Sequence, residues 1–500
     1  MQEKYAQLKN ILGEVIDLSR ASALLEWDQQ TYMPSEGGED RGNLLATIQK
    51  IEHIKFTSDE VGGLLEDLRP WVAQLDPDSD EARLVKVTQR EYDKRTKVPA
   101  DMVAEFAQIT TAAFTAWQEA REESNFAKFR PHLEKVVEWK RRYAALFAPY
   151  DHVYDALLDD FEPGMKTSEV KAIFDTLRPQ QVELIKAISN RPQVDDSFLH
   201  QPFDERKQWE FGMQVAQKFG YDLGRGRQDK AAHPFTTTFG IDDVRITTRF
   251  MPDFFSSAFF STTHETGHAL YDLGLDRALN RTPLANGASL AVHESQSRMW
   301  ENLVGRSHAF WEGHYPLLQQ VFPAQLGNVS LEAFYKGINK VEPSFIRVEA
   351  DEATYNLHIM LRLEIEIALM EGSLEVVDLP EVWNARMQEY LGVTPPDDAQ
   401  GVLQDIHWSN GYIGYFSTYA LGNLVSVQLW ERINADLPDL GDQIRRGEFA
   451  GLLGWLRKNL HRHGAKFEPQ ELVQRVTGSK IDPAPYVRYL RTKYSQIYGI

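Results

Sequence analysis

His264-Glu265-Thr266-Gly267-His268, near the middle of this 500-residue chain, predicts a metal-binding helix. Two histidines four positions apart project from one face of a helix, so both imidazoles can reach one metal ion. Glu265 lies at the edge of that face, where it can take a proton from a water molecule. The pattern is the H-E-x-x-H signature of zinc-dependent peptide hydrolysis. The alternative is a buried amphipathic helix whose two histidines only satisfy each other.

The sequence on both sides of this motif favours a helix. Residues 254–260 are apolar and contain no proline, and residues 269–273 continue the helical pattern as far as Gly274. Asp272 follows His268 by four positions and therefore shares its face. A carboxylate at that position could orient a histidine through its free ring nitrogen.

Hydrolytic zinc usually has three protein ligands and keeps its fourth position for water, so a third ligand is needed. Glu294 is our candidate, because it lies in a polar cluster within a second predicted helix (289–302), 26 residues after His268. The turn formers in 280–287 allow that helix to return antiparallel to the first. His293 competes for the role. We favour Glu294, since neighbouring helical positions diverge by about 100° and cannot both point inward.

Composition narrows the remaining possibilities. The net charge of −19 argues against a nucleic-acid partner, since phosphate binding requires basic patches. The chain has no cysteine, which excludes disulfides and thiolate ligands, so any metal must be held by nitrogen and oxygen. No apolar run is long enough to span a membrane, and the charged, amphipathic start does not resemble a signal peptide. We therefore expect a cytoplasmic enzyme.

Most of the chain has helical periodicity, which predicts a mainly α protein. No linker, repeat or low-complexity tract divides it, so we expect one domain over residues 1–500. Helices are expected at 3–30, 40–66, 81–96, 99–123, 128–147, 167–189, 203–220, 331–341, 349–371, 417–436, 448–462 and 482–496.

One segment, 233–250, departs from this pattern. It is rich in threonine and β-branched residues around a Gly-Ile-Asp-Asp turn, which predicts a short β-hairpin just before the metal-binding helix. In a metallopeptidase, a strand edge beside the metal is where an extended substrate could add its backbone. The alternative is a hairpin that only packs against the helix.

Several motifs together resemble the thermostable (Taq-type) metallocarboxypeptidases, peptidase family M32, and they extend over essentially the whole chain. Besides the two metal-binding segments, they are Trp27 to Pro34, His233-Pro234-Phe235, Asp243-Val244-Arg245-Ile246-Thr247, Ile346-Arg347-Val348-Glu349-Ala350-Asp351 and Gly401-Val402-Leu403-Gln404-Asp405-Ile406-His407-Trp408. The resemblance implies a mostly helical fold with a deep central groove, a homodimer and one divalent metal ion, zinc or in some members cobalt. It also implies stepwise removal of C-terminal amino acids with broad specificity.

The expected chemistry assigns roles to particular residues. His264, His268 and Glu294 would hold the metal, and Glu265 would act as general base and then as general acid toward the leaving amine. A further donor must stabilise the negative charge of the intermediate. Three side chains compete for that role: His407, Tyr415 and Tyr419. Each tyrosine has the alternative of being a core aromatic residue.

Recognition of a substrate α-carboxylate favours arginine, whose planar fork matches two oxygens. Arg347 is the first candidate and Arg245 the second. The alternative for Arg347 is an ion pair with an acidic residue at 349, 351 or 352. His233 and Gln404, which lie in the family-like motifs, are further candidate substrate-binding residues.

Two other functions remain open at this stage. An oligopeptidase that cuts internal bonds would share the metal site without needing a carboxylate-binding arginine. A protein with a purely structural metal would fill the fourth coordination position and would not need Glu265.

Overall fold

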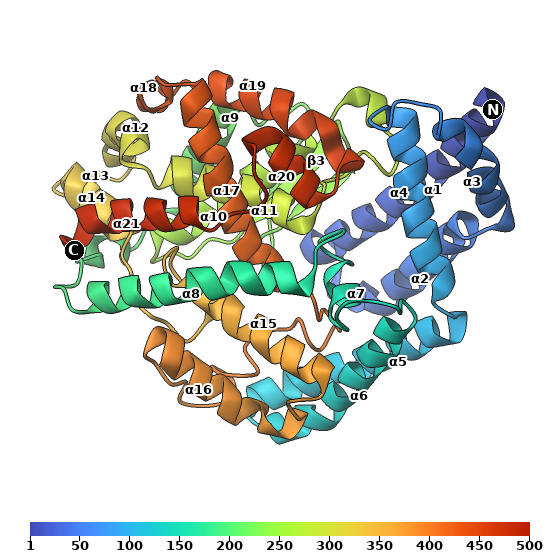
Figure 1. Ribbon diagram of the computed structural model, residues 1–500. Helices are drawn as coiled ribbons and strands as arrows, with labels where there is room; N and C mark the ends of the chain where they lie inside the picture. Colours follow the sequence, from blue (N-terminus) through green and yellow to red (C-terminus); the bar gives the residue numbers. More distant parts are fainter.

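The computed structural model describes residues 1–500 and is mainly α-helical, as predicted (Figure 1). The α-helices are α1 (Gln2–Thr31), α2 (Gly38–Phe56), α3 (Asp59–Val72), α4 (Asp80–Lys97), α5 (Ala100–Glu122), α6 (Phe126–Ala145), α7 (Asp155–Leu158), α8 (Thr167–Ser189), α9 (Glu205–Phe219), α10 (Phe255–Asp272), α11 (Leu290–Arg298), α12 (His308–Val321), α13 (Pro323–Leu326), α14 (Leu331–Ile338), α15 (Tyr355–Glu371), α16 (Leu379–Leu391), α17 (Ser417–Asp436), α18 (Leu440–Arg446), α19 (Ala450–Asn459), α20 (Pro469–Thr477) and α21 (Ala484–Tyr498). None of them combines the length and apolar character needed to cross a membrane.

Among the predicted helices, those expected at 40–66 and 349–371 differ most from the structure. The helix expected at 40–66 is interrupted, because the side chain of Ser58 caps the start of α3 by accepting a hydrogen bond from the Val61 amide. The helix expected at 349–371 begins only at Tyr355. Asp351 accepts backbone hydrogen bonds from Ala353 and Thr354, which stabilises a turn in place of a first helical turn.

The predicted hairpin is present and belongs to a three-stranded sheet. Strands β2 (Thr236–Gly240) and β3 (Asp243–Thr248) pair antiparallel. A third strand, β1 (Gln228–Lys230), pairs parallel to β3 and was not predicted, because three residues are too few to show periodicity. The strand order is β1-β3-β2, so β2 forms an edge of the sheet.

The sheet lies between two helices. Strands β2 and β3 contact α10, and β2 also contacts α1. Val244 and Ile246 are fully buried in a small apolar cluster with Ala269 of α10. Toward α1, the ring of Phe239 meets Trp27 edge-on at 6.3 Å. This arrangement holds the hairpin directly against the helix that carries the histidine motif.

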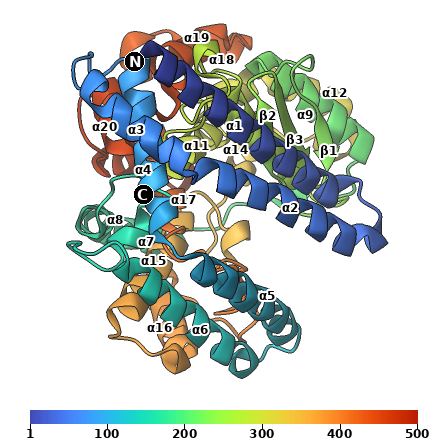
Figure 2. The same ribbon diagram turned by 90° about the vertical axis from the view of Figure 1, so that its right-hand side faces the viewer.

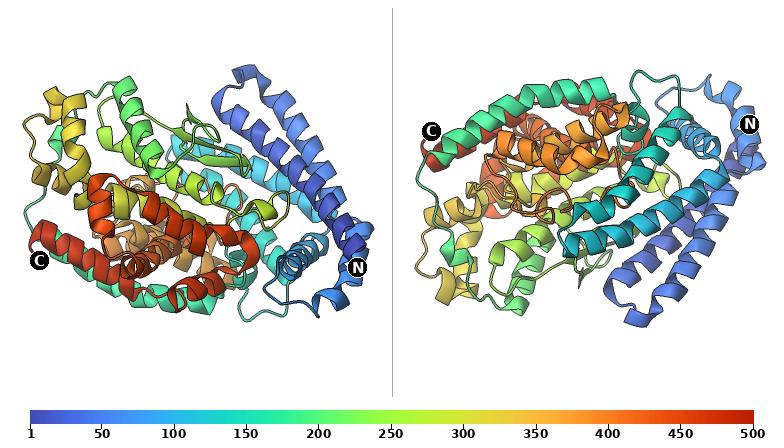
Figure 3. Two further views of the ribbon diagram at one scale, coloured as in Figure 1. Left: turned by 90° about the horizontal axis from the view of Figure 1, so that it is seen from above. Right: turned by 90° about the horizontal axis from the view of Figure 1, so that it is seen from below.

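The main apolar core runs from Ala113 to Tyr498 and surrounds α10, α11, α15 and α17. A smaller core joins α1, α3 and α4. Figure 2 shows α5, α6 and α16 at one end of the molecule and α1, α2 and the sheet at the other. Figure 3 shows α21 running beside α8 along one side, a contact that ties the end of the chain to its middle.

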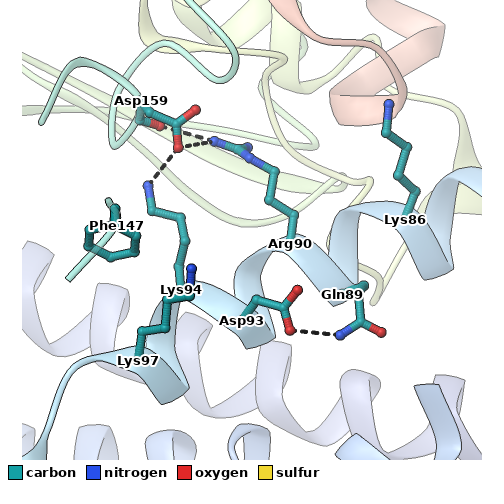
Figure 4. Close-up of a pocket in the computed structure, with 8 residues that line it drawn as sticks. All are labelled: Lys86, Gln89, Arg90, Asp93, Lys94, Lys97, Phe147 and Asp159. Carbon is teal, nitrogen blue, oxygen red and sulfur yellow. Dashed lines mark hydrogen bonds and ion pairs between the residues drawn. The ribbon is translucent and has the colours of Figure 1, made fainter. Parts of the chain in front are cut away.

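A polar pocket between α4 and the segment after α7 is shown in Figure 4. Its cationic side chains are largely neutralised within the protein, since the Asp159 carboxylate accepts hydrogen bonds from Arg90 at 2.7 Å and from Lys94 at 3.0 Å. We interpret these ion pairs as a structural contact that fixes α4 to the segment leading to α8.

Candidate active site

The three predicted metal ligands come together in one cluster. His264 and His268 lie one turn apart on α10, and Glu294 approaches them from α11. One ligand atom from each lies within 4.8 Å of the other two. The Glu294 Oε2 atom is 3.6 Å from His264 Nε2 and 3.4 Å from His268 Nε2. The two helices run antiparallel, as predicted, since Tyr271 contacts Ala288 at one end and His264 contacts Glu301 at the other.

Two glycines allow the ligand-bearing helices to approach this closely. A Cβ atom on Gly267, within the histidine motif, would lie 2.6 Å from the backbone of Gln296 and of Ser297 on α11. A Cβ atom on Gly422 of α17 would lie 2.7 Å from the Glu294 side chain. Neither position tolerates a side chain without separating the helices.

The ring of His264 is oriented from behind by Glu301. The Glu301 carboxylate lies 2.9 Å from His264 Nδ1, in the π-helix η4 (Met299–Gly305) that follows α11. Arg298 bridges the two acidic groups, donating to Glu294 at 2.7 Å and to Glu301 at 3.2 Å. Burial would raise the pKa of Glu294, but Arg298 and the two histidines hold that pKa well below its ordinary value. Glu294 is therefore an anionic ligand.

The ring of His268 is oriented through a relay. His268 Nδ1 lies 2.6 Å from His293 Nδ1, and His293 Nε2 lies 2.9 Å from Asp272 Oδ1. If His293 Nε2–H donates to Asp272, then His293 Nδ1 accepts from His268 Nδ1–H. His293 is therefore not part of the ligand cluster but contacts His268 from the other side. Asp272 orients His268 through His293 and not by direct contact.

These contacts leave the Nε2 lone pairs of His264 and His268 facing the Glu294 carboxylate. Two neutral imidazoles and one carboxylate are the donor set of hydrolytic divalent metal sites. Their side chains are 18%, 15% and 8% exposed respectively, so none of the three is fully enclosed by the protein. The residues present therefore fit a divalent ion.

Glu265 is buried beside this cluster, with 6% of its surface exposed. Its carboxylate accepts a hydrogen bond of 2.7 Å from the hydroxyl of Thr236 on strand β2. The placement matches the position expected of a general base, and this role stays a prediction.

The three candidates for stabilising the intermediate form one group. The rings of His407 and Tyr419 lie 5.3 Å and 5.3 Å from that of Tyr415, and His407 Nε2 is 3.3 Å from the Tyr419 hydroxyl. Glu294 is close enough to contribute to the raised pKa of both tyrosines, after burial. Burial lowers the pKa of His407 to about 3, so it is a neutral donor or acceptor. The choice among the three stays open.

Glu366 of α15 anchors the loop that carries this group. Its carboxylate accepts hydrogen bonds from the Trp408 indole at 2.8 Å, the Gly414 amide at 2.9 Å and the Tyr154 hydroxyl at 2.6 Å. Burial raises the pKa of Glu366 to about 7. The position of this loop therefore depends on Glu366, a residue of α15 that lies outside the loop.

Arg347 is buried and already paired, but not with the neighbours considered from the sequence. Its guanidinium donates to Asp405 at 2.8 and 3.0 Å and to the Tyr355 hydroxyl at 2.9 Å, and it lies 5.0 Å from the ring of Tyr419. It therefore borders the group around Tyr415. Its role in substrate binding stays a prediction.

None of the other proposed substrate-binding residues makes a hydrogen bond or ion pair with the three metal ligands. Arg245 pairs with Asp243 and lies over Trp27 at 4.5 Å. His233 is exposed on the connection before β2. Gln404 accepts from the Arg347 amide and from Arg362 and donates to backbone carbonyls, so its hydrogen-bonding capacity is filled within the protein.

Sequence reasoning missed Glu301, Thr236 and Glu366. Glu301 follows Glu294 by seven positions, two helical turns, so helical spacing could have identified it. Thr236 needed the strand alternation of the hairpin together with its packing against α10. Glu366 carried no local signal, because its partners come from distant segments.

Gly267→Ala tests the close packing of the ligand-bearing helices. The added methyl group must separate α10 from α11, so we expect a loss of about 1–3 kcal/mol of unfolding free energy, together with weaker metal binding. Denaturant unfolding and metal titration measure the two effects. Gly454→Ala in α19 is the control, because a Cβ atom there meets nothing within 4 Å. Equal behaviour of the two variants would contradict the packing argument.

Comparison with known proteins shows that the chain is similar to metallocarboxypeptidases over nearly its whole length. The model of the family described as carboxypeptidase Taq (M32) metallopeptidase matches residues 7–494. Thermostable carboxypeptidase 1 of Thermus thermophilus is 42% identical over 99% of both chains. Carboxypeptidase 1 of Bacillus subtilis is 40% identical, covering 98% of this chain and 97% of the relative. The crystal structure of the M32 carboxypeptidase from Deinococcus radiodurans superposes with a TM-score of 0.97 at 39% identity over the full length of both chains.

The match covers nearly the whole chain, and the histidine and glutamate cluster lies within it. The chain therefore belongs to the carboxypeptidase Taq (M32) family of metallopeptidases and is a peptide hydrolase.

Proposed function

We propose that this protein is a zinc-dependent carboxypeptidase that removes C-terminal amino acids from peptides one at a time with broad specificity. The observation that best supports this proposal is the cluster of His264, His268 and Glu294, with Glu265 buried beside it. Cobalt is an alternative metal, since the donor set of two imidazoles and a carboxylate accepts either ion.

The zinc ion, when bound, polarises the scissile carbonyl and makes a water molecule acidic enough to lose a proton near neutral pH. Glu265 takes that proton on its carboxylate and delivers it to the nitrogen of the leaving amino acid, which departs as a neutral amine. Glu301 and the relay of His293 and Asp272 keep the imidazoles in the tautomers that present Nε2.

Negative charge develops on the carbonyl oxygen as the water attacks. A hydroxyl from Tyr415 or Tyr419, or an N–H from His407, would donate a hydrogen bond to that oxygen. In support of this proposal, His407, Tyr415 and Tyr419 form one partly buried group, and the negative charge of Glu294 contributes to the raised pKa of Tyr415. Substituting each separately and comparing kcat would identify the donor, which should show the largest loss.

The substrate α-carboxylate would be recognised by Arg347. Asp405 pairs with both Arg347 and Arg362, so the two guanidiniums and one carboxylate keep a net positive charge that a substrate carboxylate would complement. An oligopeptidase needs no such contact and remains the alternative function.

A peptide with a free C-terminus should be shortened one residue at a time, and its C-terminal amide should be cleaved far more slowly. A charge-assisted hydrogen bond contributes about 1.5–3 kcal/mol, which corresponds to a roughly ten- to hundredfold difference in kcat/KM. Mass spectrometry of the C-terminal ladder, with metal analysis of the protein, measures both the direction and the ion. Equal cleavage of acid and amide would favour the oligopeptidase.

We further propose that the chain acts as a homodimer in the cytoplasm. The dimer follows from the family resemblance, and the absence of cysteine is compatible with a reducing compartment. Light scattering at several concentrations tests the first statement, and cell fractionation tests the second.

A further inference from the structure

Strand β2 presents two threonine hydroxyls to the catalytic helix. Side chains alternate along a strand, so Thr236 and Thr238 share one face while Thr237 points to the other. The Thr236 hydroxyl contacts the Glu265 carboxylate, and the Thr238 hydroxyl donates to the Asp272 carboxylate. Thr237 is paired across the ladder with Arg245, whose guanidinium lies over Trp27 of α1, so this face is directed away from α10.

We propose that Thr236 is a positioning residue for peptide hydrolysis, holding the Glu265 carboxylate in the orientation from which it receives and returns the proton. This inference rests on the function proposed above. Its basis is geometric: Thr236 Oγ1 lies 2.7 Å from Glu265 Oε2 and 3.0 Å from the Glu265 backbone oxygen.

The contact with Oε2 engages one oxygen of the Glu265 carboxylate and leaves the other for the proton. A hydroxyl has one proton to donate and two lone pairs to accept. While Glu265 is a carboxylate, the hydroxyl donates to Oε2. Oε1, which has no hydrogen-bond partner within the protein, is then free to take the proton, and Oε2 still accepts from the hydroxyl once Glu265 is protonated. The carboxyl group thus keeps one partner throughout the proton transfer.

The strand itself is fixed, which gives the hydroxyl its positional value. Thr236 is paired with Ile246 in the ladder, and Ile246 is fully buried. Immediately before Thr236, the Phe235 amide donates to the Thr247 hydroxyl at 2.9 Å. A residue held this firmly restricts the rotamer of the side chain it contacts, as preorganised sites require.

Thr238, on the same strand, is connected to the metal ligand His268 through Asp272 and His293. Its hydroxyl contacts Asp272 Oδ2, and Asp272 Oδ1 contacts His293, which contacts His268. One face of β2 therefore supports the proton carrier through Thr236 and one metal ligand through Thr238. The two supports should be separable by mutation.

Thr236→Val tests the first support, because valine keeps the shape of threonine without its hydroxyl. On a free-acid peptide we expect kcat to fall by about ten- to hundredfold, the range of one hydrogen bond to a charged group, with KM within about twofold of wild type. Thr236→Ser should recover most of the rate, and Thr236→Ala should resemble valine without added bulk. Thr237→Val is the matched control and should behave as wild type. Metal content and thermal unfolding should be unchanged in all four variants.

Combining Thr236→Val with Glu265→Gln separates positioning from general damage to the structure. If Thr236 acts through Glu265, the double variant should be no slower than Glu265→Gln alone. Failure of the proposed function would appear elsewhere, as an inactive wild-type protein or a fully active Glu265→Gln. With those behaving as expected, a Thr236→Val variant with wild-type kcat, or a serine variant as slow as valine, overturns the role of Thr236.

Thr238→Val tests the second support by metal affinity alone. Loss of one hydrogen bond in the relay should weaken zinc binding by about two- to tenfold in a chelator competition. Thr236→Val should bind zinc as wild type does. Equal zinc affinity in Thr238→Val and wild type would overturn the support through Asp272.

Discussion

Glu265→Gln should retain its metal and lose most of its activity. Glutamine has nearly the same shape as glutamate and its amide oxygen can still accept from Thr236, so the buried pocket stays filled. Its side chain cannot take or return a proton. General acid and base catalysis contributes about 10²–10⁴-fold, and we expect kcat to fall by at least that range, with the base and acid steps both lost. Steady-state kinetics and metal analysis of the same sample measure the two properties.

Glu210→Gln is the control for this substitution, because Glu210 lies on the exposed surface of α9 and pairs only with Arg206. It makes the same chemical change outside the site and should leave kcat unaltered. Near-normal turnover by a metal-loaded Glu265→Gln would remove Glu265 from the mechanism.

The metal cluster could be anticipated because its geometry is local. Helical periodicity places His264 above His268, and divergence of adjacent side chains separates Glu294 from His293. Both arguments need only the spacing within one helix. The structure brings His264, His268 and Glu294 together and puts His293 behind them.

The partners of Arg347 could not be anticipated by the same reasoning. Local spacing favours an ion pair with Glu349, Asp351 or Glu352, whereas the structure pairs Arg347 with Asp405, 58 residues further along the chain. That contact depends on how α15 and the loop before α17 pack in three dimensions. Local spacing carries no information about it, and Glu366 escaped notice for the same reason.

Two helix starts in the structure depend on capping residues, a local signal that apolar periodicity does not include. Ser58 and Asp351 each interrupt a periodic apolar pattern by binding backbone amides, and both were readable as capping residues. Strand β1 gives no such signal, since it is short and is recruited by β3. The deep central groove and the single domain expected from the sequence stay predictions.

Glu294→Ala should bind metal far more weakly than His293→Ala. Removal of Glu294 leaves two neutral imidazoles, too few ligands to hold zinc against a chelator, and we expect a loss on the order of 10³-fold or more in affinity. Among the three metal ligands His293 contacts only His268, at Nδ1, so its removal should lower metal affinity by about 10–100-fold, as expected for a residue that orients a ligand.

Substituting Glu294 also changes its ion pair with Arg298 and its packing against Gly422. A second variant can separate these effects from the loss of metal binding. Arg298 would lose its partner at 2.7 Å but keep Glu301 at 3.2 Å, so its buried charge stays paired. Glu294→Gln preserves the packing against Gly422 and removes only the ligand charge. We expect it to bind zinc more weakly than His293→Ala while unfolding at nearly the wild-type denaturant concentration. If His293→Ala proves to be the weaker binder, His293 and not Glu294 is the third ligand, because orientation of a ligand cannot outweigh the ligand itself.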